Sequence, residues 1–397
     1  MLAITILTSG ALAWFFVVEY YYSFIFESSM GSQFWLSVGK TMFYGFGAFS
    51  AIVGVFLSRK VNRRILLWSW IVIGVITSGA IIVVYELVFS LVLSALLGLS
   101  LGLGFPCSMA LLADCTKFGN RGRVSGILML QTFIMVFLAI LFEGMPGFNL
   151  IMVISICIAL RLTGSVALVL DRCEKQQGRE KSWTSILKDR KFVYYMLPWM
   201  MFNVASGLTG FVWLGLRPLS QYDMAFQLGT QLQFAGTAFV CLISGAIADR
   251  FGRKRPIMIG VILFAISYAI LGATTNEMSV LIHLTVLGVA WGFLMVVYLT
   301  IPGDLASNHA QEKFYALATI LPLAVYMGLS ALPKAIGVSA PANILSPILS
   351  VILIVSLYPV WIAEDTIPEH ELNKRRLKSH AEIIGREIAK SNEEESD

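Results

Sequence analysis

The chain has 397 residues, of which 57% are hydrophobic and only 13% are charged, against about a quarter charged in soluble domains. So few charged side chains could not cover a soluble chain of this length, which excludes an ordinary soluble protein. The apolar content excludes intrinsic disorder, and five cysteines without paired spacing exclude a disulfide framework. A polytopic membrane protein remains, in which the location of the +5 net charge matters more than its sum.

Twelve apolar runs, each about long enough to cross a bilayer as a helix, recur along the chain. They cover residues 3–27, 34–57, 65–85, 88–113, 124–145, 149–170, 192–216, 225–248, 257–275, 279–303, 315–338 and 341–363. Because backbone amides in hydrocarbon must be paired within their own segment, we expect each run to be helical. The first run lacks a basic leader and is longer than a signal-peptide core, so we expect it to be a retained span.

Basic residues predict the orientation of these spans. Most of the 29 Lys and Arg residues lie in every second linker, at 58–64, 114–123, 171–191, 249–256 and 304–314, and after residue 363. Arg217 falls on the opposite side, and Lys40, Arg161 and Lys334 lie inside apolar runs. Since basic loops stay in the cytoplasm, we predict an all-α membrane protein of twelve transmembrane helices with both termini cytoplasmic.

An internal repeat appears when the sequence is shifted by 190 residues. Asp114 then falls on Asp304, Arg63 falls on Arg253, and a pair of glycines in each half coincides. We therefore predict two parallel six-helix repeats. They divide the chain into an N-terminal half (1–170), a cytoplasmic linker (171–191), a C-terminal half (192–363) and a charged cytoplasmic tail (364–397). Two parallel halves with a site between them are typical of transporters.

A basic loop between the eighth and ninth runs carries a family resemblance. Residues 245–254 match the pattern G-x-x-x-D-R-x-G-R-K, while the copy at 55–64 is degenerate, with Arg59 in the place of the aspartate. This resembles the loop motif of the major facilitator superfamily. The resemblance implies that loop residues clip neighbouring helix ends in one state and release them in another: Gly245, Asp249, Arg250, Gly252, Arg253 and Lys254, with Arg63, Asp114 and Asp304. We expect Asp114 to pair with Arg63, and Asp304 with Arg253. The alternative is that the arginines only obey the positive-inside rule.

Three ionisable residues inside the runs are functional candidates, because charges within a membrane are costly. We expect Glu19 to pair with Arg161, with Lys40 as a competing partner for Glu19. One interpretation is a static structural pair. The other is that Glu19 takes up a proton when the pair breaks, which would couple transport to a proton gradient.

Polar and aromatic residues in several runs are candidates for a solute cavity. They are Tyr22, Gln131, Asn203, Ser206, Gln227, Gln231, Trp291, Met295 and Tyr298. The last three share one helical face, on a span that the family resemblance places at the cavity. The alternative for this aromatic stripe is core packing.

The predicted function is a secondary active or facilitative transporter of a small organic solute, working by alternating access in the plasma membrane. We expect the protein to be a monomer in the lipid bilayer. Its expected partners are the small-molecule solute and, as a candidate, protons; we expect no nucleic-acid partner, cofactor, metal or catalytic site. One alternative is a non-transporting sensor or lipid handler of the same fold. A remote alternative is an intramembrane serine hydrolase, because Gly98–Gly102 fits G-x-S-x-G around Ser100.

Overall fold

The structure is a computed structural model that describes residues 1–83, 85–165, 181–216, 222–306, 311–329, 338–367 and 377. In these residues the regular secondary structure is helical. Arg217, Lys334, Cys173, residues 171–180 of the predicted linker 171–191 and most of the predicted tail 364–397 lie outside the described part.

The first half contains α1 to α8. Their bounds are α1 Leu2–Tyr20, α2 Tyr22–Met30, α3 Gln33–Lys60, α4 Arg63–Gly79 with η1 Ala80–Val83, α5 Leu87–Gly102, α6 Phe105–Asp114, α7 Arg121–Leu141 with η2 Phe142–Gly144, and α8 Leu150–Leu162. Two predicted runs are each split into two helices. The run at 88–113 breaks before Pro106, whose ring would clash with the carbonyl of Gly102 one turn earlier.

The second half contains α9 to α17. Their bounds are α9 Trp183–Leu187, α10 Arg190–Leu216, α11 Asp223–Phe251, α12 Lys254–Ala273, α13 Glu277–Leu305, α14 Gln311–Leu329, α16 Ala342–Val355 and α17 Tyr358–Ile362. Side-chain caps begin several helices of the chain. Asn276, for example, accepts from the backbone of Ser279 at the start of α13, and Asn62 caps α4 in the same way.

Ten helices in the described ranges are long and apolar enough to cross a membrane. Two predicted runs fall short of this. The helix from Leu150 to Ser165 is shorter, and α14 carries Gln311, Glu312 and Lys313 in its first turn. Residues 166–170 and 330–337, the ends of those two runs, are not described.

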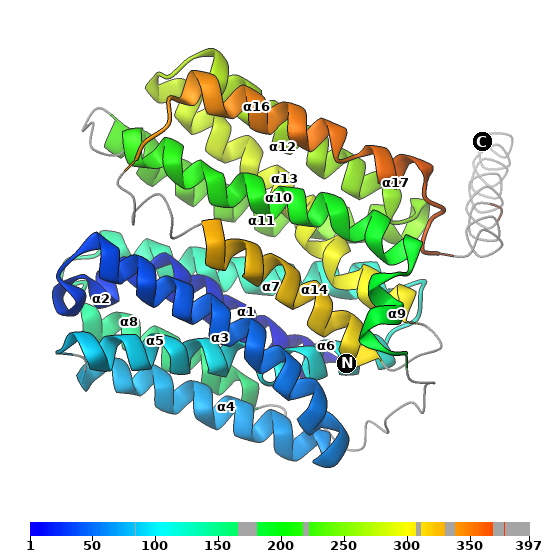
Figure 1. Cartoon of the computed structure of the whole chain (residues 1–397), viewed down its shortest axis with the longest axis horizontal. Coiled ribbons are helices and arrows are strands. Elements are labelled where there is room, and N and C mark those ends of the chain that lie inside the picture. Colours follow the sequence, from blue (N-terminus) through cyan, green and yellow to red (C-terminus); the bar gives the residue numbers. More distant parts are fainter. Residues whose placement is uncertain are drawn as a thin grey trace, which may run out of the picture.

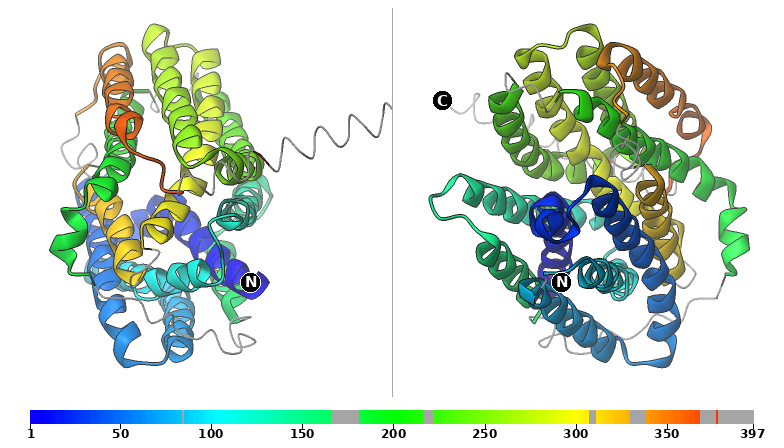
Figure 2. Two further views of the ribbon diagram at one scale, coloured as in Figure 1. Left: turned by 90° about the vertical axis from the view of Figure 1, so that its right-hand side faces the viewer. Right: turned by 60° about the vertical axis from the view of Figure 1, so that its left-hand side comes forward.

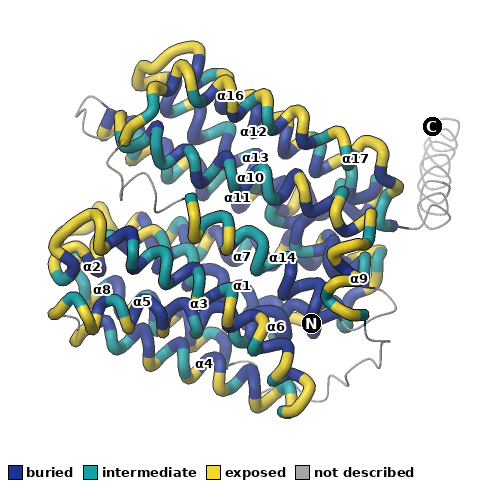
Figure 3. The backbone as a smooth tube through the Cα atoms, in the orientation of Figure 1, coloured by how far each residue is buried: buried dark blue, intermediate teal, exposed yellow. Residues whose placement is uncertain are grey.

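The helices of residues 1–165 and of residues 181–367 form two groups, one above the other in Figure 1, and both views in Figure 2 keep these groups apart. Two helices of the second group also pack against the first group: α11 packs against α7, and α14 packs against α3. Helices α1 and α13 are the most buried spans and α16 is the least (Figure 3). Many large apolar side chains on the outer faces are exposed, such as Phe89 and Phe239, as expected for surfaces in contact with lipid.

The internal repeat is visible in how the helices cross. A Cβ atom on Gly98 would overlap the carbonyl of Phe43 where α5 crosses α3. At the equivalent crossing of α13 and α11, a Cβ atom on Gly288 would overlap the carbonyl of Gln233. Each residue of the second contact lies 190 residues after its counterpart in the first contact, so the repeated glycines allow the same close helix packing in both halves.

Candidate functional site

A cavity of about 400 Å³ lies between the two helix groups. Helices α1, α3, α5, α6 and α7 line it from one side, and α10, α11, α12, α13 and α14 line it from the other. Of the residues predicted as functional, those at its wall are Glu19, Asn203, Ser206, Trp291, Met295 and Tyr298. The shared face of Trp291, Met295 and Tyr298 on α13 therefore faces the cavity, although neighbouring aromatic rings also pack against it.

The cavity wall does not include Tyr22, Gln131, Gln227 or Gln231. Helix α1 ends at Tyr20, so Tyr22 begins a new helix, and its hydroxyl bonds to Ser94 at 2.6 Å in the core of the first half. Gln131 lies within reach of Ser9 on α1, at 3.4 Å. Gln227 is exposed.

The glutamine that α11 places at the cavity is Gln233. It lies two residues beyond Gln231, which is about 200° around the helix. The prediction for this helix therefore selected the wrong face. Sequence reasoning also missed four tyrosines at the wall, Tyr44, Tyr268, Tyr315 and Tyr326. Each lies in an apolar run, where the sequence does not distinguish a tyrosine at a cavity from one packed in the protein core.

Glu19 pairs with Lys40 and not with Arg161. Its Oε1 atom accepts from Lys40 Nζ at 2.8 Å and from the Tyr44 hydroxyl at 3.1 Å. The expected pair with Arg161 is wrong, because α8 crosses α1 near Gly10, where Leu160 makes a close approach. Glu19 lies nine residues further along α1, about 13 Å away.

Arg161 is instead held inside the first half without a carboxylate among the described residues. Its Nη2 atom donates to the carbonyl of Ser100 at 3.0 Å and to the Ser100 hydroxyl at 2.9 Å. The guanidinium lies 3.7 Å from the Trp14 ring centroid and 5.2 Å from that of Trp70. The side chain is 2% exposed, so cation–π contacts stabilise its charge away from water.

The same contacts weaken the serine hydrolase alternative. Ser100 is buried, and its hydroxyl accepts a hydrogen bond from an arginine. The intramembrane histidine, His283, lies in the second half, where its Nδ1 atom contacts the carbonyl of Ser267 and its ring packs on Trp213 and Tyr268. The nucleophile and base of a hydrolase would have to be within hydrogen-bond reach of each other.

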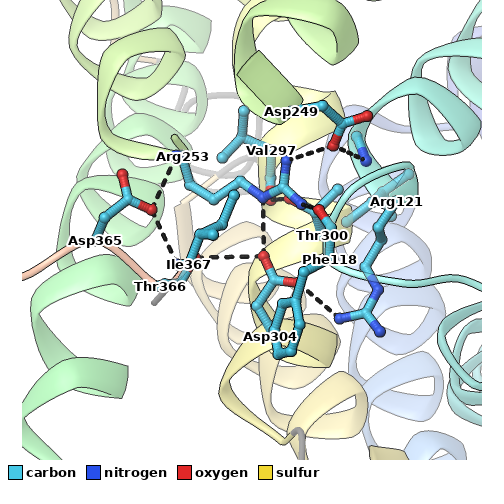
Figure 4. A network of polar contacts seen from close by, with 12 residues as sticks. Phe118, Arg121, Asp249, Arg253, Val297, Thr300, Asp304, Asp365, Thr366 and Ile367 are labelled. Atoms are coloured by element: carbon cyan, nitrogen blue, oxygen red, sulfur yellow. Dashed lines mark hydrogen bonds and ion pairs between the residues drawn. The ribbon is translucent and has the colours of Figure 1, made fainter. Parts of the chain in front are cut away.

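At one end of the cavity, four residues of the basic loops tie the two halves together, and we call them the latch: Arg121, Asp249, Arg253 and Asp304. Arg121 of the first half donates to Asp304 of the second at 2.6 Å. Asp249 accepts from the backbone N–H groups of Gly122 and Arg123, both at 2.8 Å, at the start of α7. Arg253 lies between the two aspartates, at 2.9 Å from Asp249 and 2.8 Å from Asp304 (Figure 4). A helix N-terminus favours a carboxylate, so the contacts of Asp249 with the start of α7 are favourable.

A second set of ion pairs lies at the same ends of the helices. Arg63 pairs with Asp114 at 2.8 Å within the first half, and with Glu312 of α14 at 2.5 Å across the halves. Both aspartate–arginine contacts expected from the sequence, Arg63–Asp114 and Arg253–Asp304, are therefore present. The contacts that cross between the halves were missed, because the repeat relates positions within each half only.

Glycines of the loop motif allow the close packing that the latch needs. A Cβ atom on Gly245 would overlap the backbone of Gly122, where α11 crosses α7. Gly252 has φ 95°, a left-handed conformation that glycine adopts without strain, at the turn between α11 and α12. The Gly245–Gly122 contact brings Asp249 to the start of α7.

The other two basic motif residues lie outside the latch. Lys254 Nζ donates to the carbonyls of Trp361 and Ala363, at 2.9 and 2.7 Å. The Arg250 guanidinium lies 5.2 Å from the ring centroid of Phe251. The segment that Lys254 holds continues to Asp365, which accepts from the backbone N–H groups of Arg253 and Lys254, so the chain after α17 is fastened beside the latch.

Comparison with known proteins identifies the family. The sequence model of the Major Facilitator Superfamily matches residues 1–328. The chain belongs to this superfamily. It is therefore a multi-pass membrane protein of a transporter family and not of an enzyme family.

Solved transporter structures share its fold. The proton:xylose symporter XylE bound to 6-bromo-6-deoxy-D-glucose is similar with a TM-score of 0.71 at 13% identity, covering 94% of this chain and 98% of that chain. The human organic anion transporter MFSD10 (TETRAN) reaches 0.70 at 12% identity, covering 90% and 98%. XylE from E. coli in a partially occluded inward open conformation reaches 0.63 at 13% identity, covering 92% and 98%.

A segment of the chain also resembles a curated relative. The arabinose-proton symporter of Bacillus subtilis (strain 168) is 40% identical over 83 residues, which are 20% of this chain and 18% of that relative. The match thus spans less than a fifth of the symporter's length.

Proposed function

We propose that this protein is a secondary transporter that moves a small organic solute across the membrane by alternating access. The observation that carries the proposal is the cavity of about 400 Å³, walled by both halves and closed at one end by the latch. A solute site between two parallel six-helix halves is the arrangement that such a mechanism needs. The plasma membrane and a monomeric state are the proposed setting.

The latch supports a two-state movement. Its ion pairs and backbone contacts lie at the ends of the helices that carry the basic loops, which the positive-inside rule assigns to the cytoplasm. The described conformation would then be closed toward the cytoplasm. Opening to that side requires Asp304 to release Arg121, Glu312 to release Arg63, and Asp249 to release the start of α7. A ligand that binds the two states differently would shift this equilibrium.

Glu19 is the proposed coupling site for protons. Its carboxylate lines the cavity and is 36% exposed, while its partner Lys40 is 16% exposed. Uptake of a proton would remove the charge that holds Lys40 and weaken the acceptor for the Tyr44 hydroxyl. The Tyr44 ring lies 5.5 Å from that of Tyr326 on α14, so protonation would act at a contact between the halves.

A non-transporting sensor or lipid handler of the same fold is the competing function. It would bind a ligand in the cavity without exposing the cavity to both sides. The two functions therefore differ in whether Ser206, at the cavity wall, is reached from both faces of the membrane.

The test is site-directed labelling of Ser206→Cys in a variant whose five native cysteines are replaced. A membrane-impermeant maleimide is added to right-side-out and to inverted vesicles. Alternating access predicts labelling from both sides, whereas a matched Gln227→Cys variant, exposed at the start of α11, reacts from one side. Labelling of Ser206→Cys from one side alone, at every pH tested, would refute transport.

A further inference from the structure

The wall of the cavity is mainly aromatic and aliphatic. Its aromatic side chains come from both halves, with Phe15, Phe16 and Tyr44 on one side and Trp199, Trp291 and Tyr298 among those on the other. Among the described residues the only charged side chain at the wall is Glu19, and Lys40 neutralises it. An ionic solute would find no second charge of either sign at this wall.

Most polar side chains at the wall already have partners inside the protein. The Asn203 amide donates to the carbonyl of Trp199 at 2.6 Å, and the Thr319 hydroxyl donates to that of Tyr315 at 2.8 Å. The Thr209 hydroxyl donates to Ala205 at 2.7 Å. These bonds use donor hydrogens of all three side chains, so a sugar, which carries a hydroxyl on nearly every carbon, would find few free donors at this wall. Each sugar hydroxyl left unpaired costs roughly tenfold in affinity.

Two hydrogen-bond donors at the wall lack a partner of this kind. Trp291 Nε1 and the Tyr298 hydroxyl are shielded from solvent and have no partner among the described residues. Both are on the cavity face of α13, about 10 Å apart along the helix. Tyr298 is 4% exposed, so its hydroxyl loses its bond to water without gaining another. An acceptor atom on a bound molecule would satisfy such a donor.

The aromatic rings around these donors form a stacked wall. Trp199 stacks on Tyr298 at 4.5 Å and on Phe202 at 5.0 Å between ring centroids. Trp291 lies 5.6 Å from Phe202, and 6.2 Å from Phe16 of the other half. Flat molecules bind such walls by offset or edge-on contacts with the rings.

We propose that the solute is an uncharged, flat, amphipathic molecule that carries a hydrogen-bond acceptor, taken up against Trp291 and Tyr298. This inference rests on the proposed function, because it assumes that the cavity is the solute site. It separates this chain from what the names of its sugar-transporting relatives suggest. A cavity of this size and lining is of the kind that holds small aromatic ligands.

The test is binding of four probes to the full chain in lipid nanodiscs, measured by calorimetry with empty discs as the reference. Coumarin is neutral and flat and has a carbonyl acceptor; naphthalene lacks the acceptor; N-methylquinolinium is a cation of similar size; D-xylose is a polyol. We expect coumarin to bind saturably and more tightly than the other three. Tyr298→Phe keeps the ring on Trp199 but removes the donor, so coumarin should bind about fivefold more weakly while naphthalene is unaffected.

Several results would overturn the inference. They are tighter binding of xylose or of the cation than of coumarin, binding of none of the probes, or equal coumarin affinity in the wild type, Tyr298→Phe and Trp291→Phe. Each variant's thermal unfolding is measured beside its binding, so that a misfolded variant is recognised. Failure here leaves the labelling of Ser206→Cys untouched, because that experiment needs no ligand, and only one-sided labelling there would refute the transport function itself.

Discussion

Replacing Asp304 by asparagine tests whether the latch holds the halves together. The carboxylate is fully buried and accepts from Arg121 at 2.6 Å and from Arg253 at 2.8 Å. Breaking a buried ion pair costs about 3–5 kcal/mol. Arg253 keeps Asp249 as a partner at 2.9 Å, so we expect the lower end, about 3 kcal/mol.

This loss divides between two contacts. The bond to Arg253 lies within the second half, while the bond to Arg121 crosses the halves, so only the latter is present exclusively when the latch is closed. If each contact carries half, the closed state loses about 1.5 kcal/mol relative to the open one, a shift of roughly tenfold.

The assay is the rate of maleimide labelling of Ser206→Cys from the cytoplasmic side, together with thermal unfolding in detergent. Asp304→Asn should label about tenfold faster and unfold several degrees lower, by roughly 5 °C. Thr366→Val, which loses only a 3.3 Å contact to the same carboxylate, is the matched control and should change little. An unchanged labelling rate in a variant that unfolds at a lower temperature would refute the role of the latch between the halves.

The remaining predictions concern four other positions. Glu19→Gln should abolish proton-driven accumulation while exchange of solute across the membrane continues; accumulation at the wild-type level would exclude coupling at this carboxylate. Arg161→Met should lower the free energy of unfolding by about 2 kcal/mol, because both hydrogen bonds from the guanidinium to Ser100 are lost. Thermal unfolding measures this, and an unchanged midpoint would mean that the buried arginine does not stabilise the fold. Gly98→Val should prevent folded expression, because its side chain would overlap the neighbouring backbone, and a normal monodisperse yield would contradict that. Lys191 lowers the pKa of Glu364, so any stabilisation by this pair is present above the unfolded pKa of the carboxyl and is lost as the pH falls through its folded pKa. Because the carboxylate is exposed and screened by water and salt, Glu364→Gln should lower the unfolding midpoint at pH 7 only slightly.

Several features of the fold could be predicted because they depend on local sequence. Apolar runs of sufficient length mark helices whatever their neighbours are, and Pro106 explains the break that the run pattern missed. The pairs Arg63–Asp114 and Arg253–Asp304 are related by the repeat. Each joins helix ends within one half, so the repeat offset was enough to suggest it.

Other features depend on how helices turn and cross. Whether Gln231 or Gln233 faces the cavity depends on a rotation of α11 that an almost uniformly apolar helix does not indicate. The wrong partner for Glu19 has a similar cause, because membrane depth along a sequence does not say which point of α1 meets α8. The position of a residue along its span estimates its depth in the membrane, but whether two side chains touch depends on where their helices cross.

The sequence by itself determined the membrane class, the helical runs, the repeat and the basic loop motif. The bilayer selects each span by the length of its apolar run and orients it by the basic residues in its flanking loops, and both can be read from the local sequence. Tertiary structure alone decided that Asp249 contacts the start of α7 and that Arg121 contacts Asp304. It also decided that aromatic side chains from both halves enclose one cavity. These contacts join segments more than a hundred residues apart on two separate helix groups, and only the packing of one group against the other brings them together.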